Sequence, residues 1–183
     1  MKVNLDLELI EKKLKTLEEN YDRIHSGSRS TVRACSNAIK AVHNRDTAAA
    51  KKYLKDAEQE LATIRAFETD FPDQLNHILQ EYAEARIVLS AIEKKKIPSF
   101  TELKVGEVSY LNGLLDAIGE LKREMYEALR KNNRKEAEEF FAMMEAIYDE
   151  LLPLRFSNAI LPDFRRKQDV ARIQIEQARG ELL

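Results

Sequence analysis

The stretch Glu107–Lys131, EVSYLNGLLDAIGELKREMYEALRK, decides the fold class of this chain. Its apolar side chains recur every three or four residues, so at about 100° per residue they fall on one wide arc of an α-helix. The arc is formed by Val108, Leu111, Leu114, Leu115, Ile118, Leu121 and Met125. Patterns typical of strands are nearly absent from the rest of the chain. We therefore predict an all-α protein in which this helix is central.

The opposite side of this helix carries Asp116 and Glu120 among small and amide side chains. A face that is only solvated usually carries Lys and Glu instead. Gly113 and Gly119 lie beside the two acids, although each glycine inside a helix costs about 1 kcal/mol relative to alanine. Glycines in such places indicate that another backbone or a ligand comes close. We expect the two carboxylates to lie in a cleft.

A second acid pair, Glu81 and Glu84, falls in another predicted helix, next to its apolar side. Spacings of three and four residues place both members of each pair on one helix face. Alone, a Glu-x-x-Glu pair on a charged helix is most often a solvated surface pair. Together with Asp116 and Glu120, it would form an oxygen-rich, negative site suited to Mg²⁺ or Mn²⁺. We predict that all four acids contribute to such a metal site.

Composition and helix boundaries complete the fold prediction. The 183 residues include only five Gly and four Pro, and 34% are charged, which is typical of long helices. A chain of this length without a linker is expected to form one domain, residues 1–183. Asp46 and the pair Ser99 and Glu102 are capping signals, and Ser26–Ser28 predicts a loosened turn within the first helix. We expect a single-domain bundle of six or seven helices, about 5–43, 46–68, 72–95, 107–131, 133–153 and 162–183, with a short turn after Ser99.

Charge and cysteine content narrow the class of protein. The formal net charge is −2, which argues against a chain that binds nucleic acid through an overall basic surface. Cys35 is the only cysteine, so no disulfide framework exists and a reducing compartment is expected. No apolar run approaches the roughly 18 residues of a membrane span. These features predict a cytoplasmic protein without a membrane partner.

A local basic face is still possible on the first helix. Arg29, Arg33 and Lys40 are separated by four and seven residues and therefore share a face, and His43 lies near them. We predict that this face contacts the phosphates of a nucleic acid. A solvated basic face, or one that forms salt bridges at an interface, explains the same pattern equally well. A second basic cluster, Arg165–Lys167, falls near the start of the last helix.

Three segments of the chain resemble the translin family, and specifically its catalytic branch, the translin-associated factor X proteins. The segments are LQEYAEA at Leu79–Ala85, YLNGLLDAIGELKR at Tyr110–Arg123, and the region from Ser28 to His43. They occur in the right order with compatible spacing, so the resemblance spans most of the chain. The middle segment is the most specific of the three.

This resemblance implies an all-α fold that assembles into a hollow, octamer-like shell and binds single-stranded RNA or DNA. It also implies Mg²⁺-dependent cleavage of RNA, with catalytic acids at the positions of Glu81, Glu84, Asp116 and Glu120. The shell could be a homo-oligomer or could include a second translin-type subunit. The chain departs from the family in being short, with a compact connection at 94–105.

The predicted reaction is hydrolysis of a phosphodiester by a water molecule that the metal activates, which leaves a 5′-phosphate and a 3′-hydroxyl. Glu81, Glu84 and Asp116 are the candidate metal ligands, and Glu120 is either a ligand or the general base. Two alternatives remain. One is a non-catalytic oligomer that binds single-stranded nucleic acid or acts as a scaffold. The other is an all-α nucleoside-triphosphate pyrophosphohydrolase, which also uses acid pairs on neighbouring helices.

Overall fold

Seven α-helices and one 3-10 turn make up the part of the chain that the computed structural model describes, residues 5–183, and these residues contain no strand. The all-α prediction is thus confirmed. Residues 1–4 of the predicted domain lie outside the described part. The elements are α1 (Leu7–His43), α2 (Thr47–Ile64), the 3-10 turn η1 (Arg65–Phe67), α3 (Pro72–Ile92), α4 (Phe100–Leu103), α5 (Glu107–Arg130), α6 (Arg134–Leu151) and α7 (Phe164–Glu181).

Local capping interactions set several of these boundaries. The carboxylate of Asp46 accepts a hydrogen bond from the backbone N–H of Ala49 at 2.9 Å and so begins α2. Ser99 and Glu102 form the predicted capping box at the start of α4. The side chain of Asn133 caps α6 in the same way as Asp46 caps α2. The helix starts therefore follow from residues that the sequence displays directly.

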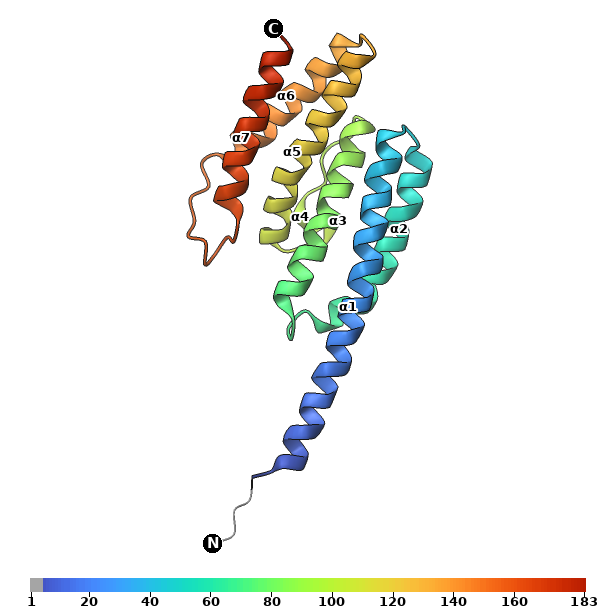
Figure 1. Ribbon diagram of the computed structural model, residues 1–183, viewed down its shortest axis with the longest axis vertical. Coiled ribbons are helices and arrows are strands. Elements are labelled where there is room, and N and C mark those ends of the chain that lie inside the picture. Colours follow the sequence, from blue (N-terminus) through green and yellow to red (C-terminus); the bar gives the residue numbers. More distant parts are fainter. Residues whose placement is uncertain (1–4) are drawn as a thin grey trace.

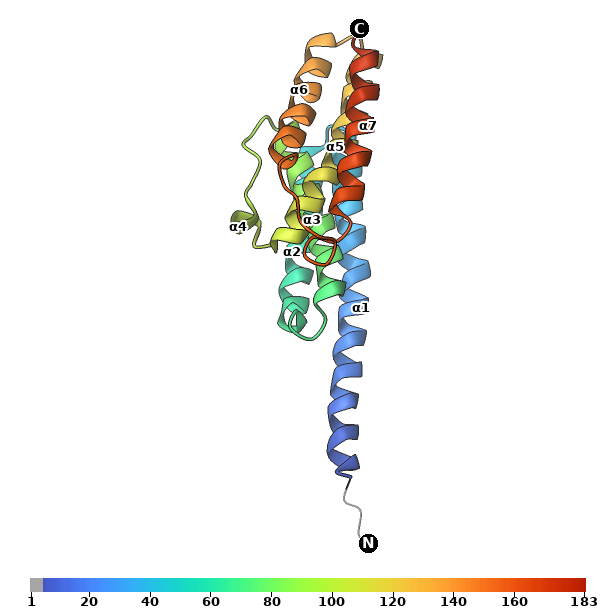
Figure 2. The same cartoon turned by 90° about the vertical axis from the view of Figure 1, so that its left-hand side faces the viewer.

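Helix α5 lies at the centre of the bundle, where it contacts α3, α6 and α7 (Figure 1). Helices α1 and α2 form an antiparallel pair that packs against α3. In the second view, α1 and α7 lie on one side of the bundle and α4 and α6 on the other (Figure 2). Both views show the first half of α1 extending beyond the other helices.

The predicted loosened turn at Ser26–Ser28 is wrong, because α1 is one continuous helix. A Cβ atom at Gly27 would lie 2.6 Å from Cγ2 of Ile64, which is closer than a real Cβ contact allows. The glycine therefore serves close packing of the end of α2 against α1. The hydroxyl of Thr31 also donates to the carbonyl of Gly27 at 2.9 Å within the helix.

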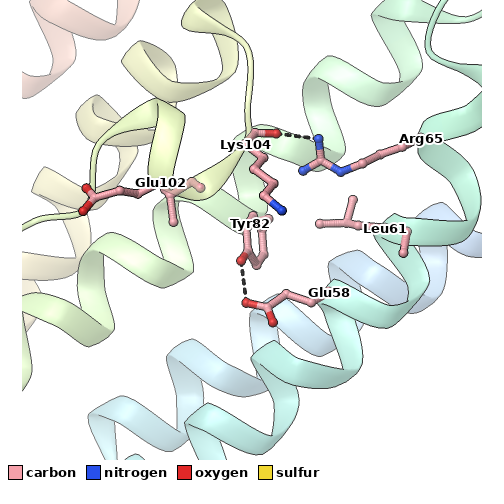
Figure 3. A pocket seen from close by; sticks show the side chains of 8 residues that line it. Glu58, Leu61, Arg65, Tyr82, Glu102 and Lys104 are labelled. Atoms are coloured by element: carbon pink, nitrogen blue, oxygen red, sulfur yellow. Dashed lines mark hydrogen bonds between the residues drawn. The ribbon is translucent and has the colours of Figure 1, made fainter.

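A pocket of about 390 Å³ lies between α2, α3 and the short helix α4 (Figure 3). The Tyr82 hydroxyl donates to Glu58 at 2.6 Å, and Arg65 donates to the carbonyl of Lys104. Burial and the Glu58 carboxylate raise the pKa of Tyr82. Neither acid pair lines this pocket, so its contacts tie α4 to the bundle. No helix within residues 5–183 is both long and apolar enough to cross a membrane.

Candidate functional site

The two acid pairs lie where α3 and α5 pack closely against each other, at Gly113. A Cβ atom at Gly113 of α5 would lie 3.0 Å from the carbonyl oxygen of Gln80 and 3.2 Å from the backbone nitrogen of Glu84, both on α3. This confirms that another backbone comes close to the glycine. Because Asp116 follows Gly113 by less than one turn, the close contact brings the acids of the two helices together.

One face of this contact opens into a pocket of about 630 Å³ at the junction of α3, α5 and α7. Glu81 and Asp116 both line it. Of the two carboxylates that we expected in a cleft, Asp116 lies in this pocket and Glu120 is not among its lining residues. Arg166 and Lys167 of α7 line the same pocket. The pocket therefore combines four carboxylates, those of Asp73, Glu81, Asp116 and Asp163, with these two cations. Such a mixture of charges suits a phosphate together with a positive ion.

Asp116 is held by residues of two other helices. The Lys167 ammonium donates to both carboxylate oxygens of Asp116 at 2.5 Å, and the Gln80 side-chain amide donates to one of them at 2.7 Å. The side chains of Lys167 and Asp116 are only 15% and 27% exposed. These contacts fix the carboxylate at the pocket wall and partly neutralise its charge.

The side chain of Glu84, in contrast, forms no hydrogen bond or ion pair with any residue in the described range 5–183, although it is half-buried. Burial and the nearby charges of Asp116, Glu81 and Glu120 raise the pKa of its carboxyl group to about 8. The charges of the other three predicted acids thus all act on Glu84. A concentration of negative charge of this kind favours either a bound proton or a bound cation.

Stability should therefore fall with rising pH in a way that depends on Glu84. The folded protein retains the Glu84 proton up to about pH 8, whereas the unfolded chain releases it near pH 4.5. The contribution of this proton to the free energy of unfolding is complete below pH 4.5 and is lost as the pH rises toward 8. Relative to the Glu84→Gln variant, we expect the wild type to lose on the order of 2 kcal/mol across this range.

Urea unfolding of both proteins at pH 5, 6, 7 and 8 in EDTA measures this difference. The exposed Glu138→Gln substitution controls for the general effect of removing a carboxylate. A constant difference in the free energy of unfolding between wild type and Glu84→Gln across these pH values would contradict the prediction.

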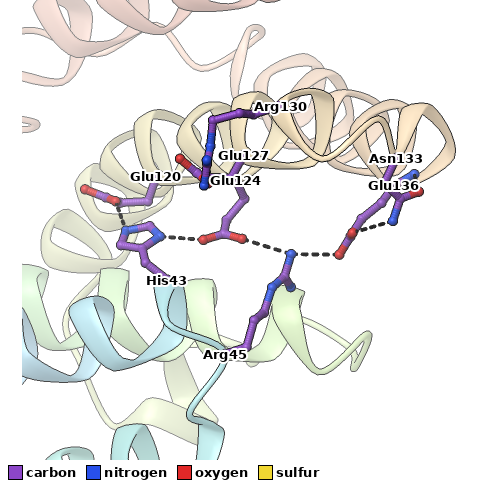
Figure 4. Close-up of polar contacts among 8 residues, drawn as sticks. All are labelled: His43, Arg45, Glu120, Glu124, Glu127, Arg130, Asn133 and Glu136. Atoms are coloured by element: carbon purple, nitrogen blue, oxygen red, sulfur yellow. Dashed lines mark hydrogen bonds and ion pairs between the residues drawn. The ribbon is translucent and has the colours of Figure 1, made fainter.

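Glu120 is held from the other side of the site, by α1. Nε2 of His43 lies 2.6 Å from Glu120, and Nδ1 lies 2.5 Å from Glu124, whose side chain is 1% exposed (Figure 4). Burial lowers the pKa of His43, but its hydrogen bonds to the two carboxylates outweigh this effect and raise it to about 9. His43 is therefore protonated at neutral pH and donates to both acids. The same hydrogen bond lowers the pKa of Glu120.

The row of alternating charges continues past Glu124 (Figure 4). Arg45 lies 3.2 Å from Glu124 and 2.8 Å from Glu136 of α6. The network thus joins the α1–α2 turn to α5 and α6. It also holds in place the His43 ring that binds Glu120. Sequence reasoning missed Glu124, although it extends the four-residue spacing from Asp116 through Glu120.

The predicted nucleic-acid contacts divide into two groups. Arg29, Arg33 and Lys40 are exposed on α1 and pair with no acid among residues 5–183, so their contact with nucleic acid stays a prediction. His43, which belonged to the same prediction, is instead engaged at both ring nitrogens, and its side chain is 7% exposed. Cys35 is buried, and the burial together with Glu81 and Glu84 raises its pKa to about 12, so it is unreactive.

The contact at Gly113 can be tested by adding one methyl group. Gly113→Ala should force α3 and α5 apart, because the new Cβ would meet backbone atoms of Gln80 and Glu84. We expect a loss of about 1 to 2 kcal/mol in the free energy of unfolding, since overpacking exceeds the gain in helix propensity. The matched control is Gly119→Ala in the same helix, where the nearest atom belongs to the flexible Gln174 side chain. Equal stability of the two variants in thermal unfolding would contradict this.

Comparison with known proteins identifies relatives of the chain. A family model described as YfdX protein matches residues 31–158, which is most of the chain. An uncharacterized protein of Methanocaldococcus jannaschii, MJ0175, is 32% identical over 161 residues, which cover 85% of this chain and 72% of that protein. The matched family model differs from the translin family that the motifs indicated.

Solved structures agree with the translin resemblance. A structure described as a complex of AfC3PO with duplex RNA has a TM-score of 0.89 and 28% identity, covering 97% of this chain and 95% of that chain. AfC3PO alone has a TM-score of 0.90 and 29% identity at the same coverage. Apo-NeC3PO has a TM-score of 0.90 and 26% identity, covering 100% of this chain and 98% of that chain. The chain therefore belongs to the YfdX family, and it has the translin-like fold of the C3PO structures.

Proposed function

We propose that the protein is a metal-dependent endoribonuclease that cleaves single-stranded RNA at the pocket between α3, α5 and α7. The observation that carries the proposal is Glu84, a half-buried carboxylate without a partner among the described residues, whose pKa three other carboxylates help to raise to about 8. A half-buried carboxylate so close to other acids favours the binding of a cation. The similar AfC3PO structure with duplex RNA supports RNA as the substrate.

The donor set fits a hard divalent cation such as Mg²⁺ or Mn²⁺, because it consists of carboxylate oxygens. Glu81, Glu84 and Asp116 would hold the ion. No group of three or more His, Cys, Asp or Glu side chains in residues 5–183 is already arranged as a metal site. Instead, Asp116 forms an ion pair with Lys167, and Glu120 forms one with His43. Metal binding therefore requires Lys167 to release Asp116, at least in part.

A divalent cation bound there would activate water for attack on phosphorus and stabilise the charge that develops on the phosphate. The side chains of the pocket would bind the phosphate. Lys167 and Arg166 lie where they can bind the phosphate, and the release of Asp116 leaves the Lys167 ammonium available for this contact. Glu120, whose pKa is lowered by protonated His43, is a weak base, which favours a role as ligand over that of general base.

The remainder of the RNA would extend from the pocket toward α1. Cys35 and His43 show that α1 borders the acids, because the first is affected by Glu81 and Glu84 and the second binds Glu120. The exposed cations Arg29, Arg33 and Lys40 of this helix would bind the flanking phosphates. A shell of several subunits, either copies of this chain or mixed with a second translin-type subunit, would enclose the RNA.

Cleavage assays test this function directly. A 5′-labelled single-stranded RNA and the matched duplex are incubated with the purified protein in Mg²⁺, Mn²⁺ or EDTA. We expect cleavage of the single strand in either metal, none in EDTA, and products that end in a 3′-hydroxyl. Cleavage that persists in EDTA, or hydrolysis of dNTPs without cleavage of RNA, would overturn the proposal; the second result would indicate the pyrophosphohydrolase alternative.

One observation favours a second candidate, an oligomer that binds nucleic acid without cutting it. Lys167 and His43 already neutralise Asp116 and Glu120, so these two acids have structural partners in the absence of metal. Binding of RNA in EDTA, with no cleavage in Mg²⁺ or Mn²⁺, would support this candidate.

A further inference from the structure

Three aromatic rings gather where α1 leaves the bundle (Figure 1). The rings of Tyr21 and His25 on α1 stack, with their centroids 6.2 Å apart and their planes 16° from parallel. Phe71, directly before α3, meets the Tyr21 ring at a centroid distance of 5.7 Å and a tilt of 57°. Tyr21 is nevertheless 44% exposed, and His25 is exposed as well. We call Tyr21, His25 and Phe71 the aromatic platform.

The aromatic platform lies on the side of α1 that faces the acids. His25 precedes His43 by 18 residues of one continuous helix, which is five complete turns. Both side chains therefore leave α1 in the same direction. Because the ring of His43 contacts Glu120 of α5, the ring of His25 is directed toward the side of the bundle on which the acids lie.

Helix geometry also gives the distance from the aromatic platform to the acids. Helices α1 and α3 pack side by side and run in the same direction (Figure 1). Tyr21 meets Phe71 at one level of the bundle, and Cys35 lies near Glu84 at another, fourteen residues later on α1 and thirteen residues later on α3. At 1.5 Å per residue, both helices cover about 20 Å between these levels. A single strand bound at the acids would reach the platform after a few nucleotides.

Cations lie between the aromatic platform and the acids. Arg29 and Arg33 continue the four-residue spacing of Tyr21 and His25, so the four side chains form one row along α1. Both arginines are exposed. Proteins that hold single-stranded nucleic acid combine these two features, because aromatic rings stack on bases while cations bind the phosphates. Bases inside a duplex stack on one another and are not free for this contact.

Packing between helices does not account for the whole arrangement. A ring that serves only to hold α3 against α1 contributes most when it is fully buried, since the gain is proportional to the apolar area removed from water. Tyr21 keeps 44% of its surface exposed, and His25 extends the stack away from Phe71 toward Arg29. The stack therefore presents aromatic surface to a ligand beside the cations.

We propose that the aromatic platform binds an unpaired nucleobase of a single-stranded RNA whose backbone runs from the acids along Arg33 and Arg29. The identity of this ligand rests on the proposed function, whereas the stacking contact does not require cleavage. A base stacked at Tyr21 and His25 would anchor the strand about 20 Å from the acids and favour single-stranded over duplex RNA.

Removal of the bases tests the site directly. Affinity is measured in EDTA by fluorescence anisotropy for a labelled single-stranded oligoadenylate and for the same strand without its bases. Tyr21→Leu keeps an apolar side chain against Phe71 but removes the aromatic ring. We expect it to weaken binding of the oligoadenylate about tenfold and to leave binding of the abasic strand unchanged, because the phosphate contacts remain. Tyr21→Phe should bind both strands as the wild type does.

Tyr126→Leu is the matched control, because it makes the same substitution at a tyrosine of α5 that is 37% exposed and lies outside the aromatic platform. It should bind both strands as the wild type does. His25→Ala is a second variant within the platform and should show the same selective loss as Tyr21→Leu. Thermal unfolding checks that each variant keeps its fold. Wild-type affinity of Tyr21→Leu and His25→Ala for the oligoadenylate, or an equal loss for both strands, would overturn the proposal.

Stacking also has a spectroscopic signature. A 2-aminopurine base loses fluorescence when it stacks on an aromatic ring. At saturating protein, a single-stranded RNA that carries this base should be quenched more strongly by the wild type than by Tyr21→Leu. Equal quenching by the two proteins would contradict the stacking contact.

These outcomes are distinct from those of the proposed function. A selective loss in Tyr21→Leu would support the aromatic platform even if the wild type cut no RNA in Mg²⁺ or Mn²⁺. Cleavage by the wild type, together with equal affinities of wild type and Tyr21→Leu for the oligoadenylate, would overturn the platform alone. Failure of the wild type to bind either strand would overturn both.

Discussion

Asp116→Asn is expected to lower the rate of metal-dependent RNA cleavage by about a thousandfold or more, because it removes one charged oxygen donor from the centre of the site. The substitution keeps the size of the side chain and its contact with Gln80, so α5 should stay in place. It also frees Lys167, which in the wild type donates to both oxygens of Asp116. Binding of RNA should therefore be unchanged or tighter, measured in EDTA by fluorescence anisotropy.

The control is Asp163→Asn, which removes a carboxylate from the same pocket. Asp163 is 63% exposed and pairs with Arg166, away from the α3–α5 contact. We expect cleavage by this variant within about threefold of wild type, since an exposed pair contributes little. Cleavage by Asp116→Asn at the wild-type rate would remove Asp116 from the mechanism, and loss of RNA binding together with cleavage would indicate a structural role.

Glu124→Gln is expected to cause the largest loss of stability, about 3 kcal/mol in the free energy of unfolding. The side chain is 1% exposed and lies between protonated His43 and Arg45. Removal of its charge leaves two cations near each other with one acid fewer between them, a situation that costs far more than the loss of a surface pair. For a chain of this length, the midpoint of thermal unfolding should fall by about 6 to 12 °C.

Glu127→Gln, one turn further along α5, provides the comparison. Glu127 pairs with Arg130 at 2.7 Å, but the two side chains are 38% and 70% exposed. This substitution should leave the free energy of unfolding close to that of the wild type, because an exposed ion pair contributes little. If the two variants unfold at the same temperature, the ion pairs of Glu124 with His43 and Arg45 in Figure 4 contribute no more to stability than the exposed pair does.

Most of the fold could be predicted because helix boundaries depend on neighbouring residues. Asp46, Ser99 and Asn133 cap their helices through hydrogen bonds to residues three positions away. The loosened turn predicted at Gly27 is wrong for the opposite reason, since its packing partner, Ile64, lies on another helix. A glycine in a sequence shows that a Cβ is absent, but not whether flexibility or close packing is the cause.

The acid pairs could be found from sequence because each pair lies on one helix and follows its period. The residues that pair with these acids in the folded protein could not be found from sequence. Lys167 and Asp116 are 51 positions apart, and His43 and Glu124 are 81 positions apart, so only tertiary packing brings them together. For the same reason, the sequence predicts that His43 belongs with the exposed cations of its own helix, although its ring contacts Glu120 and Glu124 of α5.

The wall of the acid pocket that carries Arg166 and Lys167 is the last part of the site to leave the ribosome. Helices α3 and α5 precede α7 in the chain and are therefore synthesised before it. A nascent chain that ends before α7 thus has its carboxylates but neither of these two cations of the pocket. Until α7 is synthesised, Asp116 therefore lacks the Lys167 contact that partly neutralises its charge.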